Sequence, residues 1–384
     1  MATPKIVLKI HLSRGILREL ILQLHLVLGL IAGLFLAILG LTGAVMAFEG
    51  DIDHWLHPER WYVKPGRRPL PENELVSVAQ NRFKPARVFA VQFQRTANLA
   101  QVIRMTDGTL VYLNPYDGTV LGETVGTSTS DQVLITIHQI HVRLIPDLQS
   151  TPELAVAGRF IVALASLFLC LLIPTGLALW WRDKRAFFRS KATNFKIPWF
   201  TYFQDAHLVI GLYASLFLWI AALTGILIGF DFGQNFFYLV TGTRQPAPLA
   251  PFQSTPVPEG KPLMADQVLD IAQRTFPGAS PSLMLMPLQP AAVFTVLMRV
   301  PEETSQNVHS SVMIDQFSGR VLDVRSHLTD SLGYRLLRLN RSIHNGDIFG
   351  LPSRILVSLS GLMLFALVVT GVVTWRKKLS APPQ

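Results

Sequence analysis

The chain has 384 residues, of which 50% are hydrophobic and only 15% are charged. Soluble proteins carry about 25% charged residues, so this composition indicates a membrane protein. The net charge of +9 comes largely from Lys and Arg beside the apolar segments, which is typical of cytoplasmic membrane loops and does not indicate a nucleic-acid-binding surface. The single cysteine, Cys170, excludes a disulfide framework and a thiolate metal cluster within the chain.

Four apolar segments are long enough to cross a membrane as helices. They are residues 21–48, 154–181, 206–230 and 353–375, and at ~1.5 Å per residue each covers a ~30 Å hydrocarbon core. Lys and Arg gather in the lead-in 1–20, the loop 182–205 and the tail 376–384. Because positive residues mark the cytoplasmic side, we expect both termini in the cytoplasm and residues 49–150 and 231–350 outside it.

The two segments expected outside the cytoplasm have the same internal pattern. Each has one helical stretch, NELVSVAQNRFKPA in the first and MADQVLDIAQRTFPG in the second, followed by runs in which apolar and polar residues alternate. The second segment opens with a proline-rich stretch, residues 241–262, that is typical of a linker. We expect each segment to be a small module of one helix and an antiparallel sheet, and neither contains a catalytic pattern.

The chain also repeats itself. At an offset of 182 residues His25 falls on His207, and the Leu-Thr-Gly at 41–43 falls on the Leu-Thr-Gly at 223–225. At an offset of 195 the Thr-Gly at 175–176 falls on the Thr-Gly at 370–371. The predicted fold class is an α-helical membrane protein whose four transmembrane helices form two tandem repeats, each a helix, an external αβ module and a helix.

Histidines at repeated positions are the candidate cofactor ligands. His25 and His207 lie inside the first and third apolar segments, where an ionisable side chain is costly and is functional by default. His344 precedes the fourth segment, and its counterpart before the second segment is His141 or His138, because the first copy has extra residues there. We favour His141.

Two facing histidines between membrane helices are suited to bind b-type haem as axial ligands. The chain has no Cys-x-x-Cys-His motif, which excludes covalent c-type attachment. Zinc is the rival metal, but it needs four close ligands, and no Asp, Glu or Cys accompanies the membrane histidines at a suitable spacing. The sequence therefore predicts two haem b groups, one on His25 and His207 and one on His344 with His141 or His138. We expect the other histidines of the external segments to be solvated: His54, His57, His309 and His327.

Several longer motifs occur in a fixed order along the chain. They are the early LHLVLGL helix, the strand-turn motifs YLNPYDGTVLG and MIDQFSGRVLD, the segment IHNGDIFGLPSR, and the TG-x-x-x-W endings at Thr175 and Thr370. By these motifs the whole chain resembles the PepSY-associated transmembrane proteins, a family of iron-regulated bacterial inner-membrane proteins. Within that family it most resembles the ferric-siderophore reductases of the FoxB type.

The resemblance implies a di-haem reductase of the bacterial inner membrane with two PepSY-like modules in the periplasm. Electrons would pass through the haems to a hydroxamate, ferrioxamine-like ferric siderophore, which would then release Fe(II). The chain has no nucleotide-binding glycine motif, so we expect a quinol or a separate reductase as the electron donor. No residue is assigned as catalytic. Four arginines are candidate contacts for haem propionates or for the siderophore: Arg143, Arg335, Arg338 and Arg341.

Three other functions are compatible with the sequence. The chain could belong to a siderophore or iron transporter, although it has no pair of broken helices and no acidic relay within the membrane. It could be a non-enzymatic regulator whose external modules bind a protein partner, but a regulator has no need of matched intramembrane histidines. A quinol-oxidising cytochrome b with another acceptor is the third.

Overall fold

The computed structural model describes residues 14–124, 128–145, 151–182, 199–244, 252–257, 260–301, 310–326 and 329–379. Several expectations therefore fall partly or wholly outside the described residues: the start of the lead-in, the loop 183–198, parts of the proline-rich stretch, the end of the tail, His309 and His327. The chain divides into two compact units. The helical unit comprises residues 1–45, 139–230 and 355–384, and the sheet unit comprises residues 46–138 and 231–354.

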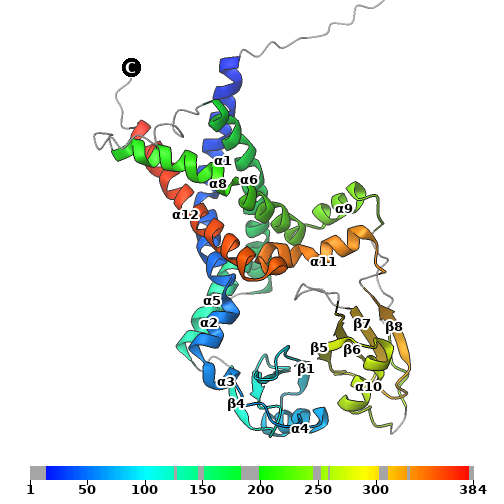
Figure 1. Ribbon diagram of the computed structural model, residues 1–384. Helices are drawn as coiled ribbons and strands as arrows, with labels where there is room; N and C mark the ends of the chain where they lie inside the picture. Colours follow the sequence, from blue (N-terminus) through cyan, green and yellow to red (C-terminus); the bar gives the residue numbers. More distant parts are fainter. Residues whose placement is uncertain are drawn as a thin grey trace, which may run out of the picture. The chain divides into compact units, whose positions relative to one another are not determined.

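Four long apolar helices make up most of the helical unit. They are α1 (Arg14–Met46), α6 (Pro152–Arg182), α8 (Trp199–Gly229) and α12 (Leu351–Leu379), which lie side by side as a bundle (Figure 1). All four are long and apolar enough to cross a membrane, and they coincide with the four segments predicted as spans. The third helix begins at Trp199 and not at the predicted residue 206, because residues 199–205, several of them aromatic, are also helical.

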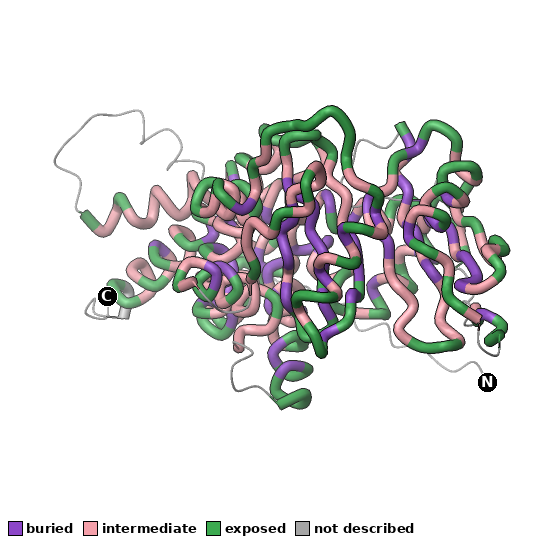
Figure 2. Tube along the Cα trace, turned by 90° about the horizontal axis from the view of Figure 1, so that it is seen from below, coloured by how far each residue is buried: buried purple, intermediate pink, exposed green. Residues whose placement is uncertain are grey.

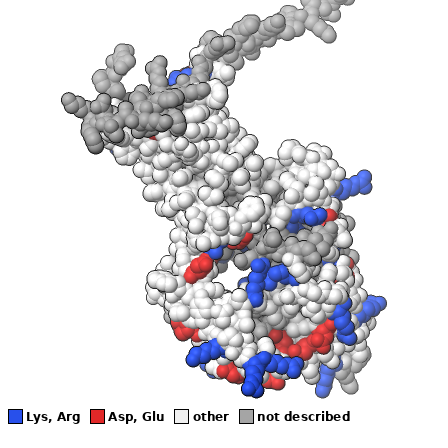
Figure 3. All heavy atoms as spheres, in the orientation of Figure 1, with Lys and Arg blue, Asp and Glu red and all other residues white. Residues whose placement is uncertain are grey.

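The bundle packs through small and branched apolar side chains. Its buried residues come from all four helices and include Ala32, Leu36, Ala165, Leu169, Ala214, Leu218 and Leu364. Gly40 of α1 and Gly361 of α12 lie so close that a Cβ on either one would overlap the carbonyl oxygen of the other, as is common between membrane helices. On the face shown in Figure 3 the bundle is almost without Lys, Arg, Asp and Glu, whereas charged side chains gather over the sheet unit.

The sheet unit contains one antiparallel sheet of eight strands in the order β4-β3-β2-β1-β5-β6-β7-β8. The strands are β1 (Val88–Gln92), β2 (Gln101–Met105), β3 (Leu110–Leu113), β4 (Val120–Thr124), β5 (Ser280–Leu285), β6 (Val293–Arg299), β7 (Ser310–Asp315) and β8 (Val321–Arg325). The two central strands pair Ala90 with Leu285 and Gln92 with Leu283. Each module thus contributes four antiparallel strands, as expected, but β1 and β5 join the two modules edge to edge into one sheet, which the sequence did not predict.

Two helices, α4 (Glu72–Arg82) and α10 (Ala265–Thr275), pack against this sheet. Leu75 of α4 and Val268 of α10 are buried in a single hydrophobic core with strand residues from both halves, and Figure 2 shows the buried stretches of the tube. The Asp266 carboxylate of α10 accepts hydrogen bonds from the backbone N–H groups of Glu72 (2.8 Å) and Asn73 (3.1 Å). The two modules are thus joined in the helix layer as well as in the sheet.

Within the described residues, five further α-helices and one 3-10 helix connect these elements: α2 (Glu49–Leu56), α3 (Pro58–Trp61), α5 (Thr129–Arg143), α9 (Asp231–Val240), α11 (Leu332–Asn345) and the 3-10 helix η2 (Asp347–Phe349). The sequence predicts only one helix in each external segment, so these helices are additional to the prediction. Most are short or directly precede or follow an apolar span, so their patterns were read as parts of loops. They matter here because α5 carries His138 and His141, and α11 carries His344.

Candidate functional site

His25 of α1 and His207 of α8 face each other inside the helical bundle. Their ring centres are 6.3 Å apart and their ring planes cross at 87°. Both rings line a cavity of about 620 Å³ whose walls are mostly leucine and other apolar side chains. Gly29 and Gly211, the glycines that the repeat places on one another, also line it. The structure therefore brings together the first predicted pair of ligands in a space that falls within the usual size of a cofactor pocket, ~300–1,000 Å³.

A threonine of α6 fixes the proton of the His25 ring. Nδ1 of His25 lies 3.0 Å from Oγ1 of Thr175. The Thr175 hydroxyl lies 2.9 Å from the carbonyl oxygen of Leu171, and because that oxygen can only accept, the hydroxyl donates its proton to its own helix. It then accepts from the histidine, which places the proton of the neutral imidazole on Nδ1 and the ligating lone pair on Nε2.

His207 is held in the same way by α12. Its Nδ1 lies 3.0 Å from the carbonyl oxygen of Leu367 and 3.1 Å from Oγ1 of Thr370. A carbonyl only accepts hydrogen bonds, so Nδ1 of His207 also carries the proton and Nε2 has the lone pair. Metal-bound histidines almost always donate their other ring N–H to an acceptor of this kind.

The glycine after each threonine lets the ring approach the neighbouring helix. A Cβ at Gly176 would lie 3.1 Å from Cε1 of His25, and a Cβ at Gly371 would lie 3.3 Å from Cε1 of His207. Both distances are shorter than ordinary van der Waals contact. The two Thr-Gly pairs that the sequence repeats at an offset of 195 therefore serve the two histidines that it repeats at an offset of 182.

The geometry of this pair fits a metal ion bound between two opposed imidazoles. A metal bonded at ~2.0 Å to one nitrogen of each ring sets the ring centres about 6 Å apart, because each centre lies roughly 1 Å behind its nitrogen. The observed 6.3 Å agrees with this. Among the described residues, the one group of three or more His, Cys, Asp or Glu that converges as a metal site lies elsewhere, in the sheet unit. Two histidines in a large apolar cavity suit haem better than zinc, which needs four ligands.

A third histidine has the same surroundings. Nδ1 of His141 on α5 lies 3.0 Å from Oγ1 of Thr42, and the Thr42 hydroxyl donates to the carbonyl of Ile38 (2.7 Å). A Cβ at Gly43 would lie 2.9 Å from Cε1 of His141. A Thr-Gly pair of α1 thus holds His141 as the other two pairs hold His25 and His207.

The other two candidate ligands lie in the sheet unit. Nδ1 of His138, one turn before His141 on α5, lies 2.9 Å from the carboxylate of Glu49, with which it forms an ion pair when protonated. This geometry favours His141 over His138 as the ligand. His344 is half-buried near the end of α11, and its pairing with His141 stays a prediction from the sequence.

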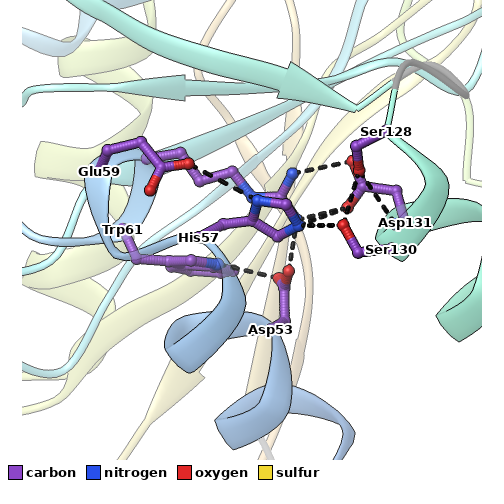
Figure 4. Close-up of polar contacts among 8 residues, drawn as sticks. Asp53, His57, Glu59, Trp61, Ser128, Ser130 and Asp131 are labelled. Atoms are coloured by element: carbon purple, nitrogen blue, oxygen red, sulfur yellow. Dashed lines mark hydrogen bonds and ion pairs between the residues drawn. The ribbon is translucent and has the colours of Figure 1, made fainter.

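The group of metal-type residues in the sheet unit is an ion-pair cluster around Arg60. Figure 4 shows Asp53, His57 and Asp131 converging, with Ser128 and Ser130 beside them. The Arg60 guanidinium donates to Asp131 (2.7 and 3.0 Å) and to Asp53, so a protein cation already balances the carboxylates. His57 bonds to Ser130 (2.9 Å), and its side chain is only 14% exposed. The expectation that His57 is solvated was therefore wrong.

This cluster has the electrostatics of a structural salt bridge. Burial alone would raise the pKa of Asp131, but hydrogen bonds from Arg60 and Ser128 and the charge of Arg60 outweigh burial and lower it. In the same way the two carboxylates raise the pKa of Arg60 above its ordinary value despite burial. Arg60 and Asp131 therefore stay charged at neutral pH, and the cluster fixes α2 and α3 against α5.

Two comparisons with known proteins bear on this site. The family model described as the PepSY-associated TM region matches residues 22–378. This range includes the four apolar helices almost completely and all five candidate histidines. No curated protein matches the chain. Because the family match covers nearly the whole chain, the chain belongs to the family defined by the PepSY-associated transmembrane region.

Proposed function

We propose that this protein is a di-haem b reductase of the bacterial inner membrane. It passes electrons across the membrane to a ferric siderophore in the periplasm, which then releases Fe(II). The observation that carries the proposal is the facing pair His25 and His207, whose Nδ1 protons are fixed by threonine and carbonyl acceptors and whose rings share one large apolar cavity.

His25 and His207 would hold the first haem as its two axial ligands. When bound, a haem with two imidazole ligands supplies one-electron transfer, since both axial positions are taken by the protein. The residues of the chain set its surroundings. The threonines orient the rings, and the glycines leave room for them. The apolar walls of the cavity exclude water and so influence the reduction potential of the haem.

We assign the second haem to His141, with His344 as its partner from the sequence repeat. Thr42, which bonds to His141, follows His25 by 17 residues on α1. At ~1.5 Å per residue that is about 25 Å of helix, close to the ~30 Å thickness of a hydrocarbon core. Two haems this far apart along α1 would provide a path for electrons from one face of the membrane to the other.

The terminal reaction is the transfer of one electron to Fe(III) bound by the siderophore. Hydroxamate oxygens are hard ligands that prefer Fe(III), so the Fe(II) product is held less tightly and exchanges more readily. The electron comes from a quinol or from a separate reductase. Arg335, Arg338 and Arg341 of α11 are candidate contacts for the siderophore or for the propionates of the second haem.

The test is the optical spectrum of the purified protein from haem-replete cells, oxidised and then reduced with dithionite, with a pyridine haemochrome count. We expect low-spin b-type bands and about two haems per chain. His207→Ala should lose about one haem, whereas Gln204→Ala, which changes another residue of the same cavity, should keep both. Colourless wild-type protein would contradict the proposal and favour the regulator or transporter.

Two further measurements make the test sharper. Crossed axial rings give a more anisotropic EPR signal in ferric low-spin haem than parallel rings, and the 87° angle predicts the anisotropic type. The protein reduced with a quinol analogue should then reduce ferrioxamine, followed with a chelator specific for Fe(II). If the protein binds haem but does not reduce any ferric hydroxamate, the haem assignment stands and a siderophore is not its electron acceptor.

A further inference from the structure

Helix α9 exposes an apolar stripe. Phe232, Phe236, Leu239 and Val240 are 57%, 64%, 75% and 66% exposed. Their spacing of four, three and one residues places them on one face of the helix. From Phe232 to Val240 the helix contains no Lys, Arg, Asp or Glu. Large apolar side chains that are scattered singly on a surface need no explanation, but four on one face of a ten-residue helix do.

The opposite face of α9 is already occupied. Tyr238 is buried on that face, and α9 packs against α11 in the sheet unit (Figure 1). Just after α9, the hydroxyl oxygens of Thr241 and Thr243 pack so closely on Gly333 of α11 that a Cβ at that glycine would overlap them. The helix is therefore fixed to the protein through one face, and the apolar stripe is a second face.

The chain places α9 next to a membrane-spanning helix. The apolar helix α8 ends at Gly229 and α9 begins at Asp231, so Phe230 alone separates them. Consecutive Cα atoms are ~3.8 Å apart, which keeps the start of α9 within several ångströms of the end of the span. The helix thus begins at the level where the hydrocarbon core meets the headgroups, and lipid is the occupant that this position supplies.

The first half of the chain provides an internal comparison. At the offset of 182, the residues that match Phe232, Phe236 and Leu239 are Gly50, His54 and His57. They lie in or next to α2, which also follows a spanning helix closely. That segment is polar, and its Asp53 belongs to the Arg60 cluster. A position after a span therefore does not by itself require an apolar stripe, and the stripe is particular to α9.

We propose that α9 is a membrane-surface helix that inserts this stripe into the lipid at the boundary between headgroups and acyl chains. Amphipathic helices bind in this way when one face is apolar and the helix is held parallel to the membrane plane. The contact anchors the second external module directly to the bilayer, in addition to its covalent links to the spanning helices. The proposal does not depend on the haem assignment.

The single cysteine makes spin labelling a direct test. In a Cys170→Ala background, the full chain in liposomes receives one nitroxide label through Phe236→Cys or through Leu239→Cys. The matched control is Gly50→Cys, the counterpart of Phe232, where a Cβ would meet nothing within 4 Å. The readout is relaxation of the label by oxygen, which partitions into lipid, against relaxation by a water-soluble nickel chelate.

We expect oxygen to relax the labels at positions 236 and 239 several-fold more than the chelate does, and the reverse order at position 50. Labels at 236 and 239 that respond mainly to the chelate would show that the stripe faces water and would overturn the proposal. Labels protected from both reagents would also overturn it, because they would show that a protein partner or a second copy of the chain covers the stripe.

Discussion

The Thr175 hydroxyl accepts a hydrogen bond from Nδ1 of His25 because its own proton goes to the carbonyl of Leu171, one turn earlier on α6. The same arrangement relates Thr370 to His207 and Thr42 to His141. In each case a threonine hydroxyl donates to a backbone carbonyl of its own helix and accepts from a histidine of another helix. This device fixes which ring nitrogen can bind a metal.

Removing the Thr175 hydroxyl should change the reduction potential of the proposed haem on His25 and His207 without removing that haem. A strong acceptor at Nδ1 makes the imidazole a better electron donor and stabilises Fe(III), so Thr175→Val should raise the midpoint potential. A hydrogen bond of ~1 kcal/mol corresponds to a shift on the order of tens of millivolts. Thr175→Ser retains the hydroxyl and should leave the potential nearly unchanged. Potentiometric titration checks this, and equal shifts in both variants would contradict it.

The two histidines of α5 should differ in their effect on haem content. If the proposal is right, His141→Ala should reduce the haem count by about one, because His141 has the same Thr-Gly surroundings as His25 and His207. His138→Ala should keep both haems, since its ring bonds to Glu49. The pyridine haemochrome count of the two purified variants decides this. Loss of haem in His138→Ala with retention in His141→Ala would reverse the assignment.

Glu72 should make the stability of the sheet unit depend on pH. Burial, with the nearby charge of Asp266, raises the pKa of Glu72 from 4.5 to about 7 although Gln101 donates a hydrogen bond to it. Between these two values the folded state keeps a proton that the unfolded chain has released. The free energy of unfolding therefore falls as pH rises through this window, by up to about 3 kcal/mol.

Glu72→Gln removes this titration. We expect the variant to match the wild type in thermal unfolding near pH 5 and to be more stable near pH 8, because the wild type then has a buried carboxylate. Thermal unfolding of both full-length proteins across this range measures the difference. An unchanged difference between the two proteins at all pH values would show that Glu72 does not titrate in this window.

The Arg60 cluster should be structural and should not bind metal. Arg60→Ala leaves the carboxylate of Asp131 buried without its cation, which costs about 3–5 kcal/mol. Arg95→Ala, at an exposed arginine of the same unit, should cost less than about 1 kcal/mol. Zn²⁺ should not raise the melting temperature of the wild type. A clear increase with zinc would show that a metal can replace Arg60 among Asp53, His57 and Asp131.

Much of the helical unit could be predicted from the sequence. The four spans are long apolar segments with few or no charged residues, and an apolar run of this length has few alternatives to a membrane-spanning helix. His25 and His207 stood out because an ionisable residue in such a segment is costly and because the repeat places one on the other. The Thr-Gly pairs were visible as repeats, but not their role, since each lies at least 99 residues from the histidine that it holds.

The sheet unit was harder to predict. The pairing of β1 with β5 is made by backbone hydrogen bonds between strands almost 200 residues apart in the chain, and backbone groups leave no signature in the sequence. The Arg60 cluster was missed for a similar reason. Asp131 lies 71 residues from Arg60, and a histidine in a polar segment such as His57 is usually solvated.

The joint between β1 and β5 also bears on how such a chain could have arisen. Each half of the sheet ends at this joint in a strand whose outer edge would otherwise be unpaired, and an open edge pairs readily with another chain. A protein with only one half would be completed by a second copy of itself, with the two edge strands antiparallel. Joining both halves in one polypeptide makes that assembly independent of protein concentration, and it leaves each half free to diverge, as the polar α2 and the apolar α9 have done.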